Sequence, residues 1–403
     1  MKKDRPQEDQ GILEQIREKA GTNRCVLCGK CAAVCPSFRN LNLEIHSPRG
    51  RMALCTAFLN GELEPGEKFL ESLSGCFMCE ACDAICPAGA APFRAIVFLK
   101  TLAPFQGIHQ ELKKCLEQKG NSPLPIRLFE CLNIRVSEKG SFFSGDAEPF
   151  SPKEGNKGKK VIYFPGCIRN YHLPDSAQAT FQALKKMNCE ISFAKEIECC
   201  GAPLLFTGSL KQVKEIAKRN LEILSQYKQS EIVCDCPTCA WMFKNYAEWF
   251  FKESPEREVA EQVSQRVKLF SEFLSENSSP DSPLFSRSYK GIKLGYLDSC
   301  IQKYGWNASG ALERILSFFK GLETTEIPEN LSCPGWGLLL VEYKGLSEKY
   351  ANRLISFVEE NHVEILVTED SALQLYMRLH HPELKVLSIS ELLVRGKYNS
   401  SQK

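Results

Sequence analysis

The sequence lacks three features that would guide a first interpretation: a strong net charge, a long apolar run and a secretion signal. Its 403 residues include 51 Lys and Arg against 49 Asp and Glu, a net charge of +2. That balance does not indicate binding to nucleic acid or to an anionic membrane surface. No stretch approaches the ~18 apolar residues of a spanning helix, and no apolar run follows the charged start "MKKDRPQEDQ". We therefore expect no signal peptide, and membrane contact only through a partner.

A nucleotide-binding fingerprint is also missing. The triplet "GWG" at 335–337 lacks the strand–turn–helix context of a dinucleotide site. The remaining composition, 43% hydrophobic and 25% charged, fits an ordinary globular protein, and the length allows two or three domains.

Cysteine, in contrast, is abundant, with 20 of the 403 residues. A short secreted chain with so many cysteines would be interpreted as stapled by disulfides. This chain is long, and its cysteines cluster with two or three residues between them. That pattern favours metal binding in a reducing compartment.

Two cysteine motifs near the N-terminus have the same spacing. "CVLCGKCAAVCP" and "CFMCEACDAICP" both follow C-x2-C-x2-C-x3-C-P, the spacing of bacterial [4Fe–4S] ferredoxins. In that arrangement three cysteines wrap one cubane cluster, and the fourth, beside proline, binds the other cluster. The spacing therefore predicts one cluster at Cys25, Cys28, Cys31 and Cys86, and a second at Cys76, Cys79, Cys82 and Cys35.

The alternative is a pair of structural zinc sites. Zinc sites usually combine two C-x2-C pairs, and the triple spacing followed by Cys-Pro, found twice, does not favour them. Helix-like apolar spacing over 47–61, 64–75 and 87–104 predicts a helical ferredoxin domain over residues 1–134. Arg49 and Arg51 either stabilise reduced clusters or form surface ion pairs, and Cys55 is expected to be a small buried hydrophobe.

The rest of the chain contains an internal repeat. After a linker at 135–158, rich in Gly, Ser and Pro, "KGKKVIYFPGC" at 157–167 resembles "KGIKLGYLDSC" at 290–300, an offset of 133 residues. We expect a first copy at 159–251, a connecting helix and loop at 252–289, and a second copy at 290–403.

Each copy alternates short apolar strands with helical periodicity. That order predicts parallel sheets covered by helices. The overall expectation is an α+β multidomain fold, with the helical two-cluster domain followed by two repeated α/β cysteine-rich domains.

The first copy carries five cysteines that follow successive strands. Open α/β sheets place ligands at that carboxyl edge, so we expect a metal or cluster there. Because four thiols suffice for zinc or a cubane, a fifth suggests a less regular cluster or one thiol left for chemistry. Cys234 should point to the other strand face and pack in the core. The five are Cys167, Cys199, Cys200, Cys236 and Cys239.

The second copy has lost most of this set. It keeps Cys300 and Cys333, whereas Pro334 replaces the second of the adjacent cysteines, and Glu369 and Ala372 stand at the places of Cys236 and Cys239. Two thiols cannot hold a four-iron cluster, so this copy is expected to be structural. One role for Asp298 and Glu369 is to supply oxygen ligands, but we expect them to cap helices or face solvent.

The two Cys-Pro motifs, "SPRGR" between them, and the C…CCG…CxxC pattern resemble the iron–sulfur subunits of glycolate oxidase. The pattern is also similar to subunits of anaerobic glycerol-3-phosphate dehydrogenase, lactate-utilisation proteins and heterodisulfide reductase. The resemblance extends from Cys25 to "ISELLVRG" near the C-terminus.

This resemblance implies a cytoplasmic electron-transfer subunit, in contact with the inner face of the membrane at most peripherally. Electrons would come from a partner FAD-containing dehydrogenase of 2-hydroxy acids and pass to quinone or another carrier. The chain itself would hold no FAD and no substrate-oxidising residue. The resemblance also implies that a complete CCG motif holds a noncubane [4Fe–4S] cluster through all five of its cysteines.

Two alternatives stay open. One is a reductase of disulfides or heterodisulfides, with chemistry at the CCG site and the ferredoxin domain as its electron supply. The other is a scaffold whose CCG domain is structural or binds zinc.

Overall fold

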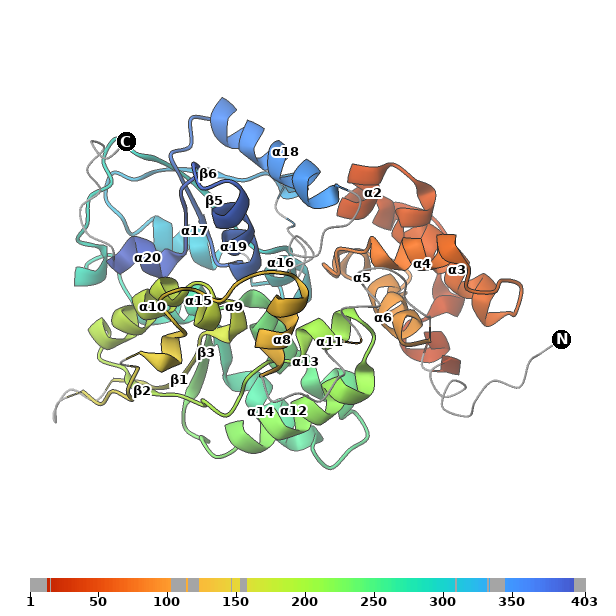
Figure 1. Ribbon diagram of the computed structural model, residues 1–403, viewed down its shortest axis with the longest axis horizontal. Helices are drawn as coiled ribbons and strands as arrows, with labels where there is room; N and C mark the ends of the chain where they lie inside the picture. Colours follow the sequence, from red (N-terminus) through yellow and green to blue (C-terminus); the bar gives the residue numbers. More distant parts are fainter. Residues whose placement is uncertain are drawn as a thin grey trace.

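The computed structural model describes residues 13–14, 16–102, 114, 123–145, 147–152, 158–308, 310–331, 333 and 345–394. A helical N-terminal part lies at one end of the molecule and two α/β repeats lie at the other (Figure 1). The N-terminal elements are η1 (Thr22–Arg24), η2 (Lys30–Val34), α2 (Pro36–Leu41), η3 (Glu44–His46), α3 (Pro48–Leu59), α4 (Glu67–Ser74), α5 (Ala81–Ala84), α6 (Pro92–Leu102) and α8 (Leu124–Cys131).

The helices expected over 47–61, 64–75 and 87–104 are present as α3, α4 and α6. Local chemistry explains the start of α3. The Ser47 hydroxyl accepts a hydrogen bond from the Gly50 amide at 2.8 Å, and Pro48 stands at the first helical position, where its missing amide costs nothing.

The first repeat is built on a parallel four-stranded sheet of order β2-β1-β3-β4. Its strands are β1 (Lys160–Phe164), β2 (Glu190–Ser192), β3 (Glu231–Cys234) and β4 (Val267–Leu269). Its helices are α9 (Gly166–Tyr171), α10 (Pro174–Lys186), α11 (Ala202–Phe206), α12 (Leu210–Leu224), α13 (Pro237–Phe250), α14 (Arg257–Arg266) and α15 (Phe270–Asn277).

The second repeat reproduces this topology as β6-β5-β7-β8, also parallel. Strands β1 and β5 begin at Lys160 and Lys293, the offset of 133 residues that the sequence shows. The elements are η5 (Pro283–Phe285), β5 (Lys293–Leu297), α16 (Cys300–Gly305), α17 (Ala311–Leu316), β6 (Glu323–Glu326), η6 (Glu329–Leu331), α18 (Leu346–Glu360), β7 (Ile365–Thr368), α19 (Ser371–His380), β8 (Val386–Leu387) and α20 (Ile389–Val394).

Two segments differ from the expected connections. Within 252–289, Val267–Leu269 forms β4 and pairs with β3, so part of the expected connecting segment completes the first sheet. Within 135–158, Phe142 is buried against Tyr163, Phe181 and Phe193, and η4 spans Phe142–Ser144. A three-residue strand between two helices gives no alternation to detect, and the Gly and Ser around Phe142 obscured its burial. Residues 153–157 of the expected linker lie outside the described residues.

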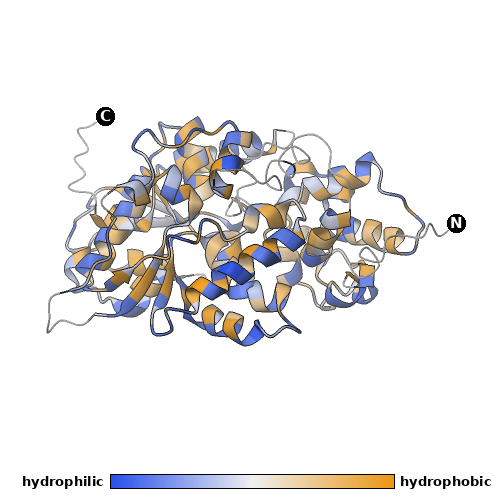
Figure 2. Ribbon diagram, turned by 60° about the horizontal axis from the view of Figure 1, so that its bottom comes forward, coloured by the Kyte–Doolittle hydropathy of each residue, from blue (hydrophilic) through white to orange (hydrophobic). Residues whose placement is uncertain are grey.

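The hydrophobic core does not follow the sequence boundaries. One cluster joins α3 and α6 of the N-terminal part to α12, α13 and one face of the first sheet. A second joins the other face of that sheet to the second repeat. Figure 2 shows hydrophobic residues along the strands and on the inward faces of the helices.

Polar side chains are buried between the two repeats. Arg169 on α9 is 0% exposed. Its guanidinium lies 3.6 Å from the Asp235 carboxylate and donates to the Glu369 carbonyl at 3.2 Å. The Glu369 carboxyl accepts from the Ser271 amide at 2.9 Å and lies 3.4 Å from Gln302 Nε2. Glu369 is therefore a buried interface residue. The expectation that it faces solvent is wrong, whereas the expected helix cap is present, because its carboxyl accepts from the Ser271 amide in the first turn of α15.

Glu369 generates a pH prediction. Burial raises the pKa of its carboxyl from 4.5 to about 8, so the folded chain keeps it protonated where the unfolded chain is ionised. Its contribution to stability is complete below the unfolded pKa and is lost as the pH rises through about 8. As the pH rises from 5 to 8, the unfolding free energy of Glu369→Gln should increase relative to that of wild type by up to about 4 kcal/mol, because wild type loses this contribution and the variant does not. Anaerobic urea unfolding at both pH values measures this.

The exposed Glu359 on α18 supplies the matched control. Glu359→Gln should keep the wild-type pH dependence. If Glu369→Gln also kept it, the protonated state of Glu369 would be contradicted.

Candidate metal centres

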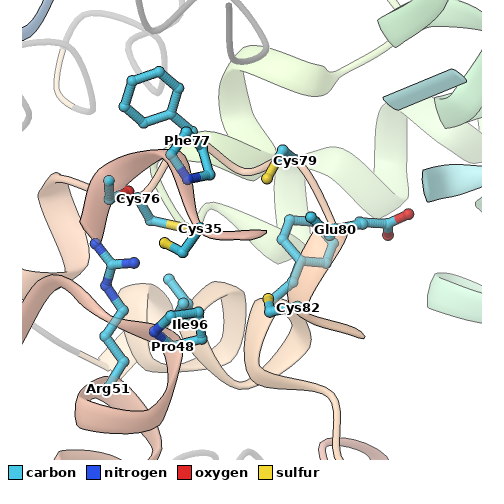
Figure 3. Close-up of a pocket in the computed structure, with 13 residues that line it drawn as sticks. Cys35, Pro48, Arg51, Cys76, Phe77, Cys79, Glu80, Cys82 and Ile96 are labelled. Atoms are coloured by element: carbon cyan, nitrogen blue, oxygen red, sulfur yellow. The ribbon is translucent and has the colours of Figure 1, made fainter. Parts of the chain in front are cut away.

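Cys35 and three cysteines of the second motif line one pocket, whose empty space of about 310 Å³ includes the part open to solvent. Figure 3 shows Cys35, Cys76, Cys79 and Cys82 around this space. Cys35 is the residue that precedes α2, and Cys82 lies in α5. All four are buried. The structure therefore brings together the set that the spacing predicts.

The other set lines a cavity of about 360 Å³. Its members are Cys25, Cys28, Cys31 and Cys86. Cys28 is exposed and the other three are half-buried. The neighbouring Val26 and Leu27 are 73% and 46% exposed, which places this site at the molecular surface.

Both motifs fold through the same backbone turn. The residue before the second cysteine and the residue after it have positive φ in each copy: Leu27 at 53° and Gly29 at 82°, then Met78 at 58° and Glu80 at 61°. Non-glycine residues rarely adopt this region. The turn curls the chain around the space that the thiols line, and this explains why the two-residue spacing recurs.

A buried cation, Arg51, lines the inner cavity, and a second, Lys100, lies buried nearby. Arg51 is 2% exposed, and its Nε donates to the Ser72 carbonyl at 2.7 Å. Its buried Nη2 has no hydrogen-bond partner among the described residues. The side chain points toward Cys35 and Cys76 in Figure 3. Lys100 is also buried, and burial lowers its pKa to about 8, whereas the Cys76 thiolate opposes that change.

Arg49 behaves differently from Arg51. It lines the outer cavity and forms an exposed ion pair with Glu44 at 2.8 Å. The sequence left both roles open for the two arginines. The structure separates them, with Arg49 in a surface pair and Arg51 beside the inner cysteines. Cys55 is fully buried in the core, as expected.

The five cysteines of the first repeat converge at the carboxyl edge of its sheet. Cys167 follows β1 on α9, the adjacent pair Cys199 and Cys200 follows β2, and Cys236 and Cys239 follow β3 on α13. The strand order reverses between β1 and β3, which is where open α/β sheets bind ligands. Side-chain contacts link Cys167 with Cys199, Cys199 with Cys200, Cys200 with Cys239, and Cys239 with Cys236.

Gly166 is required next to this set. Its φ is +75°, and a Cβ atom there would lie 3.2 Å from the Cys239 sulfur and 3.3 Å from the Cys236 Cβ. The glycine therefore gives the backbone the close approach that a compact thiol cluster needs. Cys234 is fully buried in the core, as expected.

The thiols differ in acidity. Hydrogen bonds from Cys167 and Cys200 hold the pKa of Cys199 well below its ordinary value. The hydrogen bond from Cys239 lowers the pKa of Cys236 to about 6, and the Ser371 hydroxyl contributes in the same direction. Ser371 belongs to the second repeat, at the place of Thr238 in "CPTC". The second repeat thus donates a hydrogen bond to the thiol set of the first.

The remaining thiols of the second repeat lie at a different place. Cys300 and Cys333 contact Cys79 of the inner ferredoxin set and pack with Phe77, Ala81 and Leu346. Two positions that carry cysteines in the first repeat hold Glu369 and Ala372 in the second. Glu369 forms the interface hydrogen bonds described above. Asp298 accepts from the Gly310 amide at 3.0 Å, in keeping with the expected helix cap. Pro334 and "GWG" lie outside the described residues.

One hydrogen bond links the inner cavity to the first repeat. Trp241 Nε1 donates to Glu80 Oε2 at 2.9 Å. Trp241 stands two residues after Cys239, and Glu80 stands between Cys79 and Cys82. In Figure 3 the Glu80 carboxyl points away from the cysteines, toward the repeats.

The donor sets suit a multinuclear sulfur-bound group better than one ion. Within the described ranges, no three His, Cys, Asp or Glu side chains are arranged to hold a single metal ion. Zinc requires thiolates at about 2.3 Å from one point. Sets of four cysteines around a space of about 310 Å³, with an orphaned Arg51 nitrogen beside it, fit a larger and anionic group.

These features define a class, an iron–sulfur protein with a two-cluster ferredoxin domain and paired cysteine-rich domains. Residues 21–90 match the "4Fe-4S dicluster domain" family, and residues 161–244 and 294–374 match the "Cysteine-rich domain" family, known as CCG.

Proteins that match nearly the whole chain show which members of this class it is similar to. The chain is homologous to the probable glycolate oxidase iron–sulfur subunit of Bacillus subtilis, with 26% identity over 88% of each chain. It is similar to the glycolate oxidase iron–sulfur subunit of Escherichia coli, with 24% identity over 91% of this chain and 94% of the relative. A fumarate reductase (CoM/CoB) subunit from Methanothermobacter marburgensis is 24% identical over 94% of this chain and 73% of its own.

Sequence reasoning missed four residues around these sites: Lys100, Glu80, Trp241 and Ser371. Lys100 lies in an apolar helical stretch, where a lone lysine is a detectable anomaly. Ser371 could have been found by aligning "EDSA" with "CPTC". The pairing of Glu80 with Trp241, 161 residues apart, leaves no trace in a single sequence.

Arg51 generates a prediction about reduction potential. Arg51→Gln removes a buried cation near an anionic group, so the reduced state should lose stabilisation. We expect the potential of one [4Fe–4S] signal to fall by on the order of 50–100 mV. EPR-monitored redox titration measures it. Arg51→Lys retains the charge and should retain most of the potential, and Arg49→Gln, at the exposed pair, should change little. An unchanged potential in Arg51→Gln would remove the electrostatic role.

Gly305, the last residue of α16, generates a packing prediction. A Cβ atom there would lie 2.5 Å from Trp241 Cδ1 and 3.1 Å from Glu80 Oε2. Although alanine favours helices, Gly305→Ala should lower the unfolding free energy by about 1–3 kcal/mol through overpacking. Anaerobic thermal melts measure it. Gly66→Ala, with no atom within 4 Å of the new Cβ, is the control. Equal melting of the two variants would contradict the close approach.

Proposed function

We propose that this chain is the electron-transfer subunit of a complex that oxidises a 2-hydroxy acid such as glycolate or lactate. A partner FAD-containing dehydrogenase supplies the electrons, and quinone or another carrier accepts them. The partner and the acid follow from the relatives named glycolate oxidase iron–sulfur subunits. The observation that carries the proposal is the continuous series of cysteine sets from the surface to the first repeat.

In this proposal the two ferredoxin sets hold cubane [4Fe–4S] clusters, which take up and release one electron each. Cys25, Cys28, Cys31 and Cys86 bind the outer cluster, and Cys35, Cys76, Cys79 and Cys82 bind the inner one. The exposure of Cys28, Val26 and Leu27 supports electron exchange with another protein at the outer set.

A third cluster, of the noncubane [4Fe–4S] type, is bound by Cys167, Cys199, Cys200, Cys236 and Cys239. The mutual contacts of all five thiols and the close approach at Gly166 support this assignment. The hydrogen bond between Trp241 and Glu80 joins this set to the inner cubane set. The protein functions in the cytoplasm, with peripheral contact at the membrane through its partner. In the described part of the chain, no helix is long and apolar enough to cross a bilayer.

A second candidate, a disulfide or heterodisulfide reductase, is favoured by one observation. A pocket beside Cys167 is lined by Phe143, Tyr171, Lys195 and Glu198 and opens to solvent, which gives an external reactant access to this thiol. Against it, the second repeat keeps two of five thiols, so paired clusters acting on one disulfide are not available.

Cys200→Ser tests the assignment of the third site. The holoprotein should contain about 12 irons per chain, and the variant about 8, with the cubane EPR signals retained. Electron flow from the reduced flavoprotein to the acceptor should fall. Anaerobic iron and sulfide analysis, EPR and a reconstituted assay measure these quantities.

Cys189→Ser, at a buried cysteine outside all the sets, is the control and should keep about 12 irons. Zinc in place of the additional iron would overturn the cluster assignment. Unchanged electron flow in Cys200→Ser would place the site off the path. Turnover of a disulfide by this chain with a reductant alone would favour the second candidate.

A further inference from the structure

Three thiols meet where the ferredoxin part contacts the second repeat. Cys79, Cys300 and Cys333 form mutual side-chain hydrogen bonds. Cys79 belongs to the inner ferredoxin set, whereas Cys300 and Cys333 belong to no ligand set. The retained pair of a degenerate motif therefore lies directly against a residue proposed to bind a cluster.

The fold fixes Cys300 at the start of a capped helix. Cys300 is the first residue of α16, and the cap of that helix is built from Ser299 and Gln302, each bonded to the other's backbone. Helix α16 packs against α5, the helix that follows Cys79. Apolar residues enclose the three sulfurs: Phe77, Ala81 and Leu346, with Val34 and Leu41 at the edge.

Burial excludes an external thiol or disulfide from this place. Cys300 and Cys333 are 2% and 8% exposed. A disulfide requires sulfur atoms close enough for an S–S bond of about 2.05 Å after a small movement. Cys300 and Cys333 share a side-chain hydrogen bond inside one buried cluster, so a disulfide requires only that the two sulfurs approach each other further. The electrons for their oxidation and reduction then have to pass through the adjoining inner set.

A phenol–carboxylate pair lies at the edge of the same cluster. Tyr304 packs there, and its hydroxyl donates to the Glu329 carboxylate, which is half-exposed. Tyr304 is close enough to Cys79 and Cys333 to interact with them electrostatically.

We propose that Cys300 and Cys333 form a redox-active dithiol that exchanges electrons with the inner cluster site and stores an electron pair. The disulfide accepts two electrons and two protons, the S–S bond breaks, and two thiols form. Oxidation reverses this: both S–H bonds break, the S–S bond forms, two protons leave and two electrons pass to the inner set. The electrons come one at a time from the reduced [4Fe–4S] group bound by Cys79 and its partners, which is reduced again by its own electron supply between the two transfers.

This store complements one-electron clusters. A flavin that oxidises a hydroxy acid releases an electron pair, whereas each cubane accepts one electron. The dithiol gives the chain a two-electron centre next to its one-electron path. The proposal rests on the proposed electron-transfer function, in particular on a cluster at the inner set.

The test uses full-length holoprotein with its iron content verified. One sample is oxidised with a mild dye and one is reduced with dithionite. Both are quenched in acid, alkylated and digested for mass spectrometry. We expect a peptide pair joined by a Cys300–Cys333 disulfide in the oxidised sample, and both residues alkylated in the reduced sample. Absence of the linked pair from oxidised holoprotein would overturn the proposal.

A coulometric titration gives the second readout. Wild type should accept about two more electrons per chain than Cys300→Ser/Cys333→Ser. The matched control, Cys55→Ser/Cys189→Ser, also removes two buried thiols and should accept as many electrons as wild type. If all three proteins accepted the same number of electrons, Cys300 and Cys333 would have only a packing role. If the double variant shifted a cubane potential without accepting fewer electrons, the pair would only tune that reduction potential. Either result would overturn the proposal.

The outcomes separate the two proposals. Missing iron at the inner set would defeat the function itself. Full iron content and normal electron flow without a Cys300–Cys333 bond would defeat the dithiol alone. A disulfide between Cys79 and Cys300 or Cys333, found only in the iron-depleted fraction, would show that these thiols become oxidised after the cluster is lost. That result would also overturn the dithiol proposal.

Discussion

The hydrogen bond from Trp241 to Glu80 lies where the three parts of the structure meet. Glu80 has φ 61° at the position that Gly29 occupies in the first motif. In this left-handed conformation a residue with a side chain has a higher conformational energy than glycine. A side chain is nevertheless present, and it reaches 2.9 Å from the Trp241 indole. Gly305 of the second repeat packs on the same pair. One strained residue therefore holds a cysteine loop of the ferredoxin part against both repeats at once.

Charge distribution follows the same division between inner and outer sites. The inner cysteines have buried Arg51 and Lys100 nearby, in a region with little water to screen them. The outer cysteines have Arg49, which Glu44 already neutralises at the surface. Because interactions between charges strengthen as water is excluded, the protein controls the inner site mainly through fixed charges. The outer site, where Val26 and Leu27 are exposed, is governed more by solvent.

The cysteine motifs predicted the structure better than the apolar periodicity of the segments between them. Metal-site spacing is dictated by bond geometry, so the exchange of Cys35 and Cys86 between the two sets could be predicted from residues alone. Strands β1, β3, β5 and β7 were visible because both of their faces are apolar. Strand β4 has three residues and β8 has two, too short for any periodicity. Contacts such as Ser371 with Cys236, or Cys333 with Cys79, arise from docking of distant segments. The solvent-facing role expected for Glu369 failed because the copies face each other across that residue.

The shared core has a consequence for how the molecule can be divided. Phe93 and Phe98 of α6 pack on Trp249 of α13 with ring centroids 5.8 Å and 5.9 Å apart, inside one cluster that spans the ferredoxin part and the first repeat. A cut between these parts would expose aromatic surface on both sides. The ferredoxin part and the first repeat therefore fold together as one cooperative unit, which is larger than the single α/β repeat that was duplicated. Neither of the two is an independent module.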